Sequence, residues 1–159
     1  AGLALTALVN VAVIVLYSGA LKHRPFADLT AMGAWGVSMA MVGFPLDSAD
    51  GWRFASLLGV LCMVTEAVQT LRDVSSDRAA GVKTTAVALG ADATGWIARS
   101  LIALAAVLAA TQLHPVGALL ALGLFVPLSP ERANASWDVL RVLFGLTWLA
   151  LLAAYRFGR

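Results

Sequence analysis

Six long apolar segments restrict what this chain can fold into more than any other feature. They cover residues 3–21, 29–44, 52–71, 96–113, 116–128 and 139–155. Leu, Ala and Val dominate them, without the strict alternation of barrel strands, so we expect helices. A helix needs about 20 apolar residues to cross roughly 30 Å of hydrocarbon, and the second and fifth segments are shorter. We therefore predict an all-α, polytopic transmembrane bundle with about six membrane helices.

The composition also indicates an integral membrane protein. Hydrophobic residues make up 60% of the chain and charged residues only 13%, whereas an ordinary soluble domain has roughly 25% charged residues. The formal net charge of +2 is too small to suggest nucleic-acid binding. We expect a single transmembrane domain over residues 1–159 and no nucleic-acid partner.

Basic residues between the apolar segments predict how the bundle is oriented. Lys and Arg near the ends of membrane helices accumulate on the cytoplasmic face. If the segments cross alternately, one side collects six of them: Lys22, Arg24, Arg72, Arg78, Lys83 and Arg132. We therefore predict that the loop from Asp73 to Lys83 is cytoplasmic and that the chain starts and finishes on the other side. Because the sequence begins without a signal peptide, we expect an odd number of spans before it.

Residues 65–90, TEAVQTLRDVSSDRAAGVKTTAVALG, concentrate the acids, bases and amides of this apolar chain. Glu66, Gln69, Asp73 and Asp77 are spaced by three, four and four residues, which places them along one stripe of a helix. The first two lie inside the third apolar segment, where polar groups are costly and are functional candidates by default. This stripe is the strongest indication of a functional site.

Asp73 and Asp77 lie one helical turn apart and can share a divalent cation. Magnesium suits such a pair, because it commonly binds one or two carboxylates, keeps some waters and accepts substrate phosphates. Arg72 and Lys83 are close in sequence, and Lys22 is on the same predicted face. Acids that hold a cation beside bases can bind a diphosphate. The alternative is a solvated loop with surface ion pairs, which are common and weak.

Residues 73–90, DVSSDRAAGVKTTAVALG, resemble the second aspartate-rich motif of the UbiA superfamily of intramembrane prenyltransferases. The family pattern is DxxxD, a glycine, then a threonine and an apolar run that ends in Leu-Gly or Phe-Gly. The matching residues are Asp73, Asp77, Gly81, Thr84 or Thr85, Val87, Leu89 and Gly90. Upstream, LYSGALKHRP resembles the Tyr and Lys pair of the family, with Tyr17 and Lys22 in those places. An asparagine often found just beyond is replaced by Asp28.

The resemblance covers essentially the whole chain but begins at the fourth of the nine helices usual in the family. It implies that the chain corresponds to helices 4–9, an incomplete UbiA-like domain. The first aspartate-rich motif, NDxxD or a variant, does not occur in the sequence. Three preceding helices would be the odd number that the charge distribution requires.

The resemblance implies magnesium-dependent transfer of a polyprenyl group from its diphosphate to a lipophilic or aromatic acceptor. By the motif match, Asp73 and Asp77 would hold magnesium, which neutralises charge on the departing diphosphate. Four further side chains are expected at the diphosphate: Tyr17, Lys22, Arg72 and Lys83. We expect Glu66 and Gln69 to line the cavity near the acceptor.

Other interpretations remain open. The chain can be one half of a split enzyme, or a homologue without the first motif that has a structural role in a larger membrane complex. A transporter or lipid-binding bundle of unrelated chemistry is a further alternative. Both acids and the bases after them are present, which favours the enzyme. Its partners would be polyprenyl diphosphate, lipids, and either preceding helices or other membrane subunits.

Overall fold

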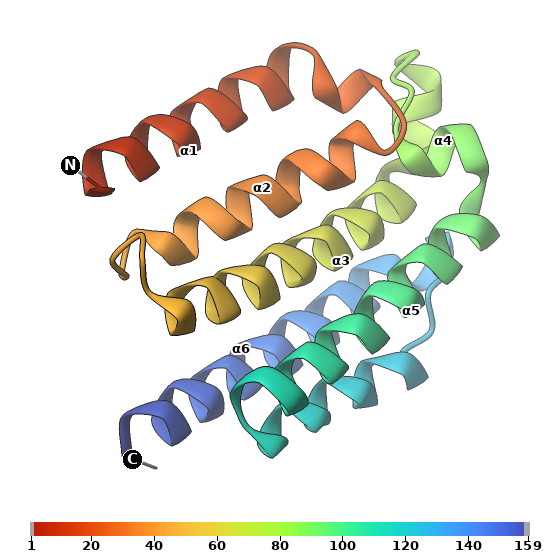
Figure 1. Ribbon diagram of the computed structural model, residues 1–159. Helices are drawn as coiled ribbons and strands as arrows, with labels where there is room; N and C mark the ends of the chain where they lie inside the picture. Colours follow the sequence, from red (N-terminus) through yellow and green to blue (C-terminus); the bar gives the residue numbers. More distant parts are fainter. Residues whose placement is uncertain (1, 158–159) are drawn as a thin grey trace.

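The computed structural model describes residues 2–157, in which every regular element is a helix (Figure 1). The longer helices are α1 (Gly2–Gly19), α2 (Ala27–Met41), α3 (Ala49–Ala79), α5 (Ala91–Leu108) and α6 (Ala133–Phe157). The shorter ones are η1 (Leu21–His23), α4 (Thr85–Leu89), the π-helical turn η2 (Ala109–Leu113), and the 3₁₀ helices η3 (Pro115–Phe125) and η4 (Pro130–Arg132). The predicted all-α bundle is confirmed, and each of the six apolar segments forms a helix.

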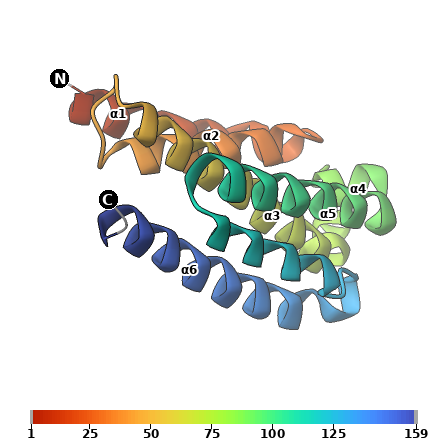
Figure 2. The same ribbon diagram turned by 60° about the horizontal axis from the view of Figure 1, so that its bottom comes forward.

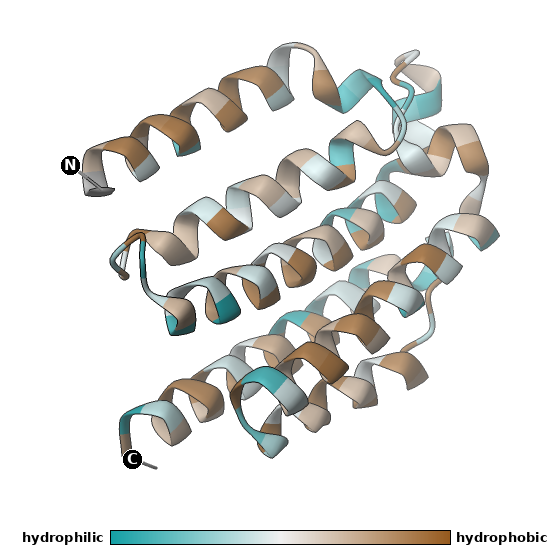
Figure 3. Cartoon of the chain, viewed as in Figure 1, coloured by the Kyte–Doolittle hydropathy of each residue, from teal (hydrophilic) through white to brown (hydrophobic). Residues whose placement is uncertain are grey.

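The helices differ in whether they are long enough to cross a membrane. Three stretches meet the requirements of length and hydropathy, namely Ala49–Ala79, Ala91–Leu113 and Pro130–Phe157. The second and fifth segments are short, as expected, because α2 has 15 residues and η3 has 11. The first is shorter than expected, since the chain leaves α1 at Gly19 and turns into η1. Hydrophobic residues dominate α1, α5 and α6, whereas α3 carries hydrophilic residues as well, above all in its C-terminal part (Figure 3).

The central helix is α3, which contacts α2, α4, α5 and α6 (Figures 1 and 2). Its approach to α2 is close because glycines lie between the two backbones. A Cβ added to Gly36 would lie 2.7 Å from Cys62 Sγ and 2.8 Å from the Leu58 carbonyl oxygen. One added to Gly59 would lie 3.0 Å from the Gly33 carbonyl oxygen. Small residues at these positions let α2 and α3 pack with their backbones nearly in contact.

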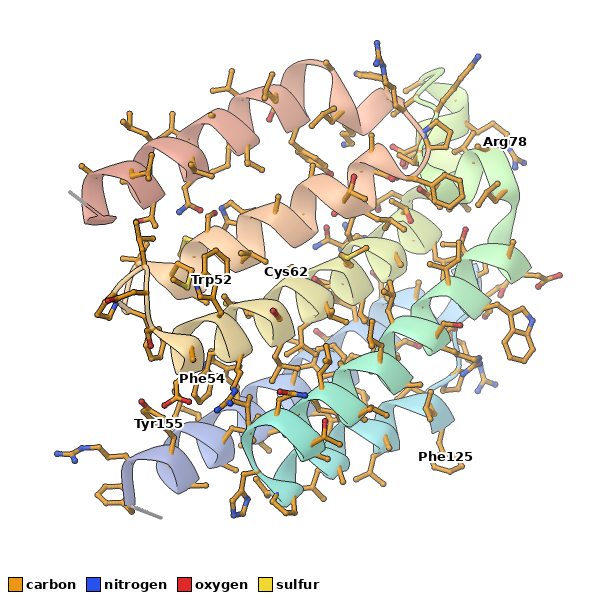
Figure 4. The ribbon with its side chains drawn as sticks, viewed as in Figure 1. Trp52, Phe54, Cys62, Arg78, Phe125 and Tyr155 are labelled. Carbon is orange, nitrogen blue, oxygen red and sulfur yellow. The ribbon has the colours of Figure 1, made fainter. Side chains whose placement is uncertain are left out.

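The main core fixes α5, η3 and α6 against α3. It includes Phe54, Leu57, Leu61, Val64 and Val68 of α3 with Ile102, Leu120 and Leu140 of the other elements. The Phe54 ring lies 5.5 Å from the Trp148 ring and 5.4 Å from the Tyr155 ring (Figure 4). Arg99 Nη1 donates a 2.8 Å hydrogen bond to the Leu124 carbonyl oxygen and so holds the end of η3.

The two chain ends lie at one end of the bundle, and the DxxxD motif lies at the other (Figure 1). At this second end, which we call the aspartate end after Asp73 and Asp77, α1 and α3 finish and α6 begins. Arg78 projects there beside α4 (Figure 4). The six basic residues predicted on one side therefore share one end of the bundle.

Candidate active site

The predicted polar stripe occupies the C-terminal part of α3. The Glu66 side chain is buried, with 3% of its surface exposed, and Asp77 is 9% exposed. Gln69 and Asp73 are half-buried. With 31 residues, α3 extends beyond the length that spans hydrocarbon, so the stripe runs from the apolar interior to the aspartate end. Buried carboxylates need partners, because their transfer out of water is costly.

The partner of Glu66 comes from α1. Tyr17 Oη donates a 2.6 Å hydrogen bond to Glu66 Oε1, across 49 residues of sequence. Tyr17 is also near enough to Asp77 for the two to interact electrostatically. Lys22, in η1, interacts in the same way with Glu66 and Asp73. The fold thus brings the upstream Tyr and Lys pair to the DxxxD motif.

Arg72 is paired with its neighbour Asp73. Its Nε donates to Oδ1 at 2.7 Å and its Nη2 donates to Oδ2 at 2.8 Å, so the guanidinium grips both carboxylate oxygens. The pair is partly exposed and contributes at most about 1 kcal/mol to stability. Its main effect is to orient the Asp73 carboxylate. Lys83 lies exposed in the loop between α3 and α4.

A third buried carboxylate, Asp28, ties the start of α2 to the start of α4. Its Oδ2 accepts from the Thr85 backbone N–H at 2.7 Å, and its Oδ1 accepts from Thr85 Oγ1 at 2.6 Å. Thr85 Oγ1 in turn accepts from the Phe26 backbone N–H at 2.8 Å. These bonds hold the loop that carries Lys83 against the bundle.

An apolar groove opens between α3 and α6, with a volume of about 290 Å³. Its α3 wall includes Leu58, Cys62 and Thr65 (Cys62 is labelled in Figure 4). With Gln69 and Asp73, these residues follow spacings of four, three, four and four, which places them on one face of α3. The groove-lining residues of α3 therefore share one face of the helix with Asp73 of the aspartate end.

The comparison with protein-family models matched residues 1–157 to the UbiA prenyltransferase family. The chain belongs to this family. Searches among curated proteins and among solved structures returned no match. The resemblance seen in the two sequence motifs is thereby confirmed, and the chain is a membrane protein of a prenyltransferase family.

In this member of the UbiA family, Asp73 and Asp77 are the side chains that can hold a cation at the aspartate end. Within residues 2–157, no group of three His, Cys, Asp or Glu side chains can enclose a metal ion. Two carboxylates one helical turn apart nevertheless fit magnesium, provided that waters and substrate phosphates complete its shell. These two carboxylates are therefore the candidates for the metal ligands that the sequence predicts.

Sequence reasoning missed two residues near this site. Asp28 stood out only as a departure from the family asparagine, because an acid in the first turn of a helix is common whether it is buried, as Asp28 is, or exposed, as Asp92 is. Arg141 lies among otherwise apolar residues of α6 and lines the groove. Its charge inside the sixth apolar segment is the signal that could have identified it.

Proposed function

We propose that this protein transfers a polyprenyl group from its diphosphate to a lipophilic or aromatic acceptor and that it requires magnesium. The observation that supports this most is the convergence of Tyr17, Lys22, Asp73 and Asp77 at one end of an apolar bundle. A polar site of this kind beside an apolar groove suits a substrate with a charged head and a hydrocarbon tail.

The diphosphate lies at the aspartate end in this proposal. Asp73 and Asp77 would hold magnesium, and Arg72 keeps the Asp73 carboxylate in position. Bound magnesium supplies neutralisation of the negative charge on the departing diphosphate. Lys22 and Lys83 contribute positive charge to the same group.

The prenyl tail lies in the groove between α3 and α6. The face of α3 that runs from Leu58 through Thr65 to Asp73 joins this groove to the diphosphate site. A tail inserted there leaves its first carbon at the mouth of the groove, next to the aspartate end.

Tyr17 and Glu66 act at that mouth. When the bond between the first prenyl carbon and the diphosphate oxygen breaks, its electron pair leaves with diphosphate and positive charge develops on the carbon. The Tyr17 ring, held by Glu66, can stabilise this charge. A nucleophilic carbon or oxygen of the acceptor then bonds to the prenyl carbon and releases its proton to water. Gln69 lines the acceptor space.

One observation favours a second candidate function. The sequence lacks an NDxxD motif, so two carboxylates are the whole of the predicted metal site within these residues. A homologue that never acquires further metal ligands would instead be a structural subunit of a membrane complex.

We propose that the aspartate end faces the cytoplasm. Labelling with a membrane-impermeant maleimide tests this, because Cys62 is buried and contributes little background. Ser76→Cys is expected to react only after cells are opened, whereas Asp47→Cys is expected to react in intact cells. The reverse pattern would contradict the orientation.

The metal role is tested by Asp73→Asn and Asp77→Asn in the complete natural protein, reconstituted in liposomes. Each change is expected to lower the rate of prenyl transfer about 100-fold or more, because bound metal contributes several kcal/mol to charge stabilisation. Asp47→Asn, an exposed acid in the loop before α3, serves as the control and keeps the normal rate. Normal rates in both DxxxD variants would exclude the assigned role.

A further inference from the structure

Among the residues that the structure describes, Arg141 is the only charged one that lines the groove between α3 and α6. The rest of the lining is apolar except for the Thr65 hydroxyl, which donates to the Cys62 carbonyl oxygen at 2.9 Å within its own helix. A cation on an apolar bundle wall is costly and is a candidate for function.

The register between the two helices places Arg141 at the mouth of the groove. The helices α3 and α6 run antiparallel (Figure 1), and Ala133 packs in one cluster with Leu71. At 1.5 Å per residue, Arg141 lies about 12 Å along α6 from Ala133, and Thr65 lies about 9 Å along α3 from Leu71. Arg141 therefore lies about 3 Å farther from the aspartate end than Thr65, and these two are the groove-lining residues of α6 and α3 that lie nearest to that end.

The guanidinium of Arg141 points toward the aspartate end. Its Nη2 donates a 3.1 Å hydrogen bond to Asp138 Oδ1, and Asp138 lies nearer to the start of α6. The two side chains are 66% and 67% exposed, so this ion pair is weak. It is the only hydrogen bond of the guanidinium within residues 2–157, which leaves further donors for a ligand.

We propose that Arg141 binds an anionic group, a carboxylate or a phosphate, on the acceptor that receives the prenyl group. This inference rests on the proposed transferase function. The acceptor must approach the first prenyl carbon, which lies between the diphosphate and the tail, and that is the level of the guanidinium. Arginine pairs with carboxylate and phosphate through two parallel hydrogen bonds. The diphosphate already has Lys22 and Lys83, so Arg141 is available to the acceptor.

The test measures prenyl transfer from geranylgeranyl diphosphate by the complete natural protein in liposomes. Two pairs of acceptors differ only in charge: para-hydroxybenzoate with its methyl ester, and glycerol phosphate with glycerol. We expect kcat/KM to be at least about tenfold higher for one acid than for its neutral counterpart, since hydrogen bonds to charged groups are strong. The pair that shows the difference identifies carboxylate or phosphate as the recognised group.

Variants then assign the effect to Arg141. Arg141→Gln is expected to raise KM for the acid about tenfold, with KM for geranylgeranyl diphosphate and transfer to the neutral acceptor unchanged. Arg141→Lys keeps the charge and is expected to retain part of the preference. The control is Arg53→Gln, which removes a similar pair with Asp50, 2.9 Å apart at the opposite end of α3.

The outcomes separate this inference from the proposed function. Equal kcat/KM for acid and neutral acceptors, or an Arg141→Gln variant with unchanged KM, would overturn the acceptor role while transfer itself stands. The acceptor role would also be overturned if Arg141→Gln weakened transfer to acid and neutral acceptors alike. That result would indicate that Arg141 has a structural role or anchors the chain to lipid headgroups. Failure of the natural protein to release any diphosphate would overturn the proposed function together with the inference.

Discussion

At the scale of single residues, the hydrogen bond between Tyr17 and Glu66 links the upstream Tyr and Lys pair to the polar stripe on α3. It joins α1 to α3 where the apolar interior gives way to the aspartate end. A carboxylate that is only 3% exposed depends on such a partner, because an unpaired buried acceptor loses its bond to water without replacement. The pair therefore contributes to stability as well as to the proposed site.

Tyr17→Phe is expected to lower the free energy of unfolding by about 1 to 3 kcal/mol, because Glu66 then loses its donor. Glu66→Gln keeps an acceptor for the Tyr17 hydroxyl and is expected to cost less. Urea unfolding of the two variants in detergent, followed by tryptophan fluorescence, measures the difference. A Tyr17→Phe variant as stable as the natural protein would show that this hydrogen bond does not hold α1 in place.

At the scale of helices, the bonds from Asp28 to Thr85 determine where α4 lies. Since α4 has only five residues, it has little stability of its own. Three hydrogen bonds around Thr85 supply the stability that so short a helix lacks. The loop with Lys83 is consequently held next to the start of α2.

Asp28→Ala is expected to lower the free energy of unfolding by about 2 to 3 kcal/mol, because it leaves the Thr85 N–H and O–H buried without a charged acceptor. Transfer activity is also expected to fall, because the loop that carries Lys83 is then held less firmly against the bundle. The matched control is Asp92→Ala, which removes an exposed acid from the first turn of α5. If both variants unfold at the same urea concentration as the natural protein, the Asp28 anchor has no role in stability.

Long apolar segments made the helices predictable, since only helices satisfy the backbone over such lengths in lipid. The end of α1 at Gly19 was not predictable, because the apolar run continues through Leu21 and the turn into η1 depends on packing. The stripe on α3 followed from spacing alone. The pairing of Glu66 in this stripe with Tyr17 could not be predicted from spacing, because a contact across 49 residues depends on how whole helices are arranged. Only the family motif indicated that both belong to one site.

At the scale of the whole molecule, the fold separates a polar end from an apolar body. The aspartate end collects Asp73 and Asp77 of α3 and the basic residues around them, and Thr65 and Arg141 mark the end of the groove that lies nearest to it. The groove then leads away along α3 between helices long enough to span a membrane. A substrate with a charged head and an isoprenoid tail matches this division, which is the central claim for this protein.

The most direct measurement is the metal dependence of diphosphate release from a polyprenyl diphosphate by the complete natural protein in liposomes. Release is predicted to require magnesium, to stop when EDTA removes it, and to return when magnesium is added back. Asp73→Asn with Asp77→Asn is predicted to abolish the response to magnesium. Release that continues at the same rate in EDTA, or no release under any condition, would contradict the account.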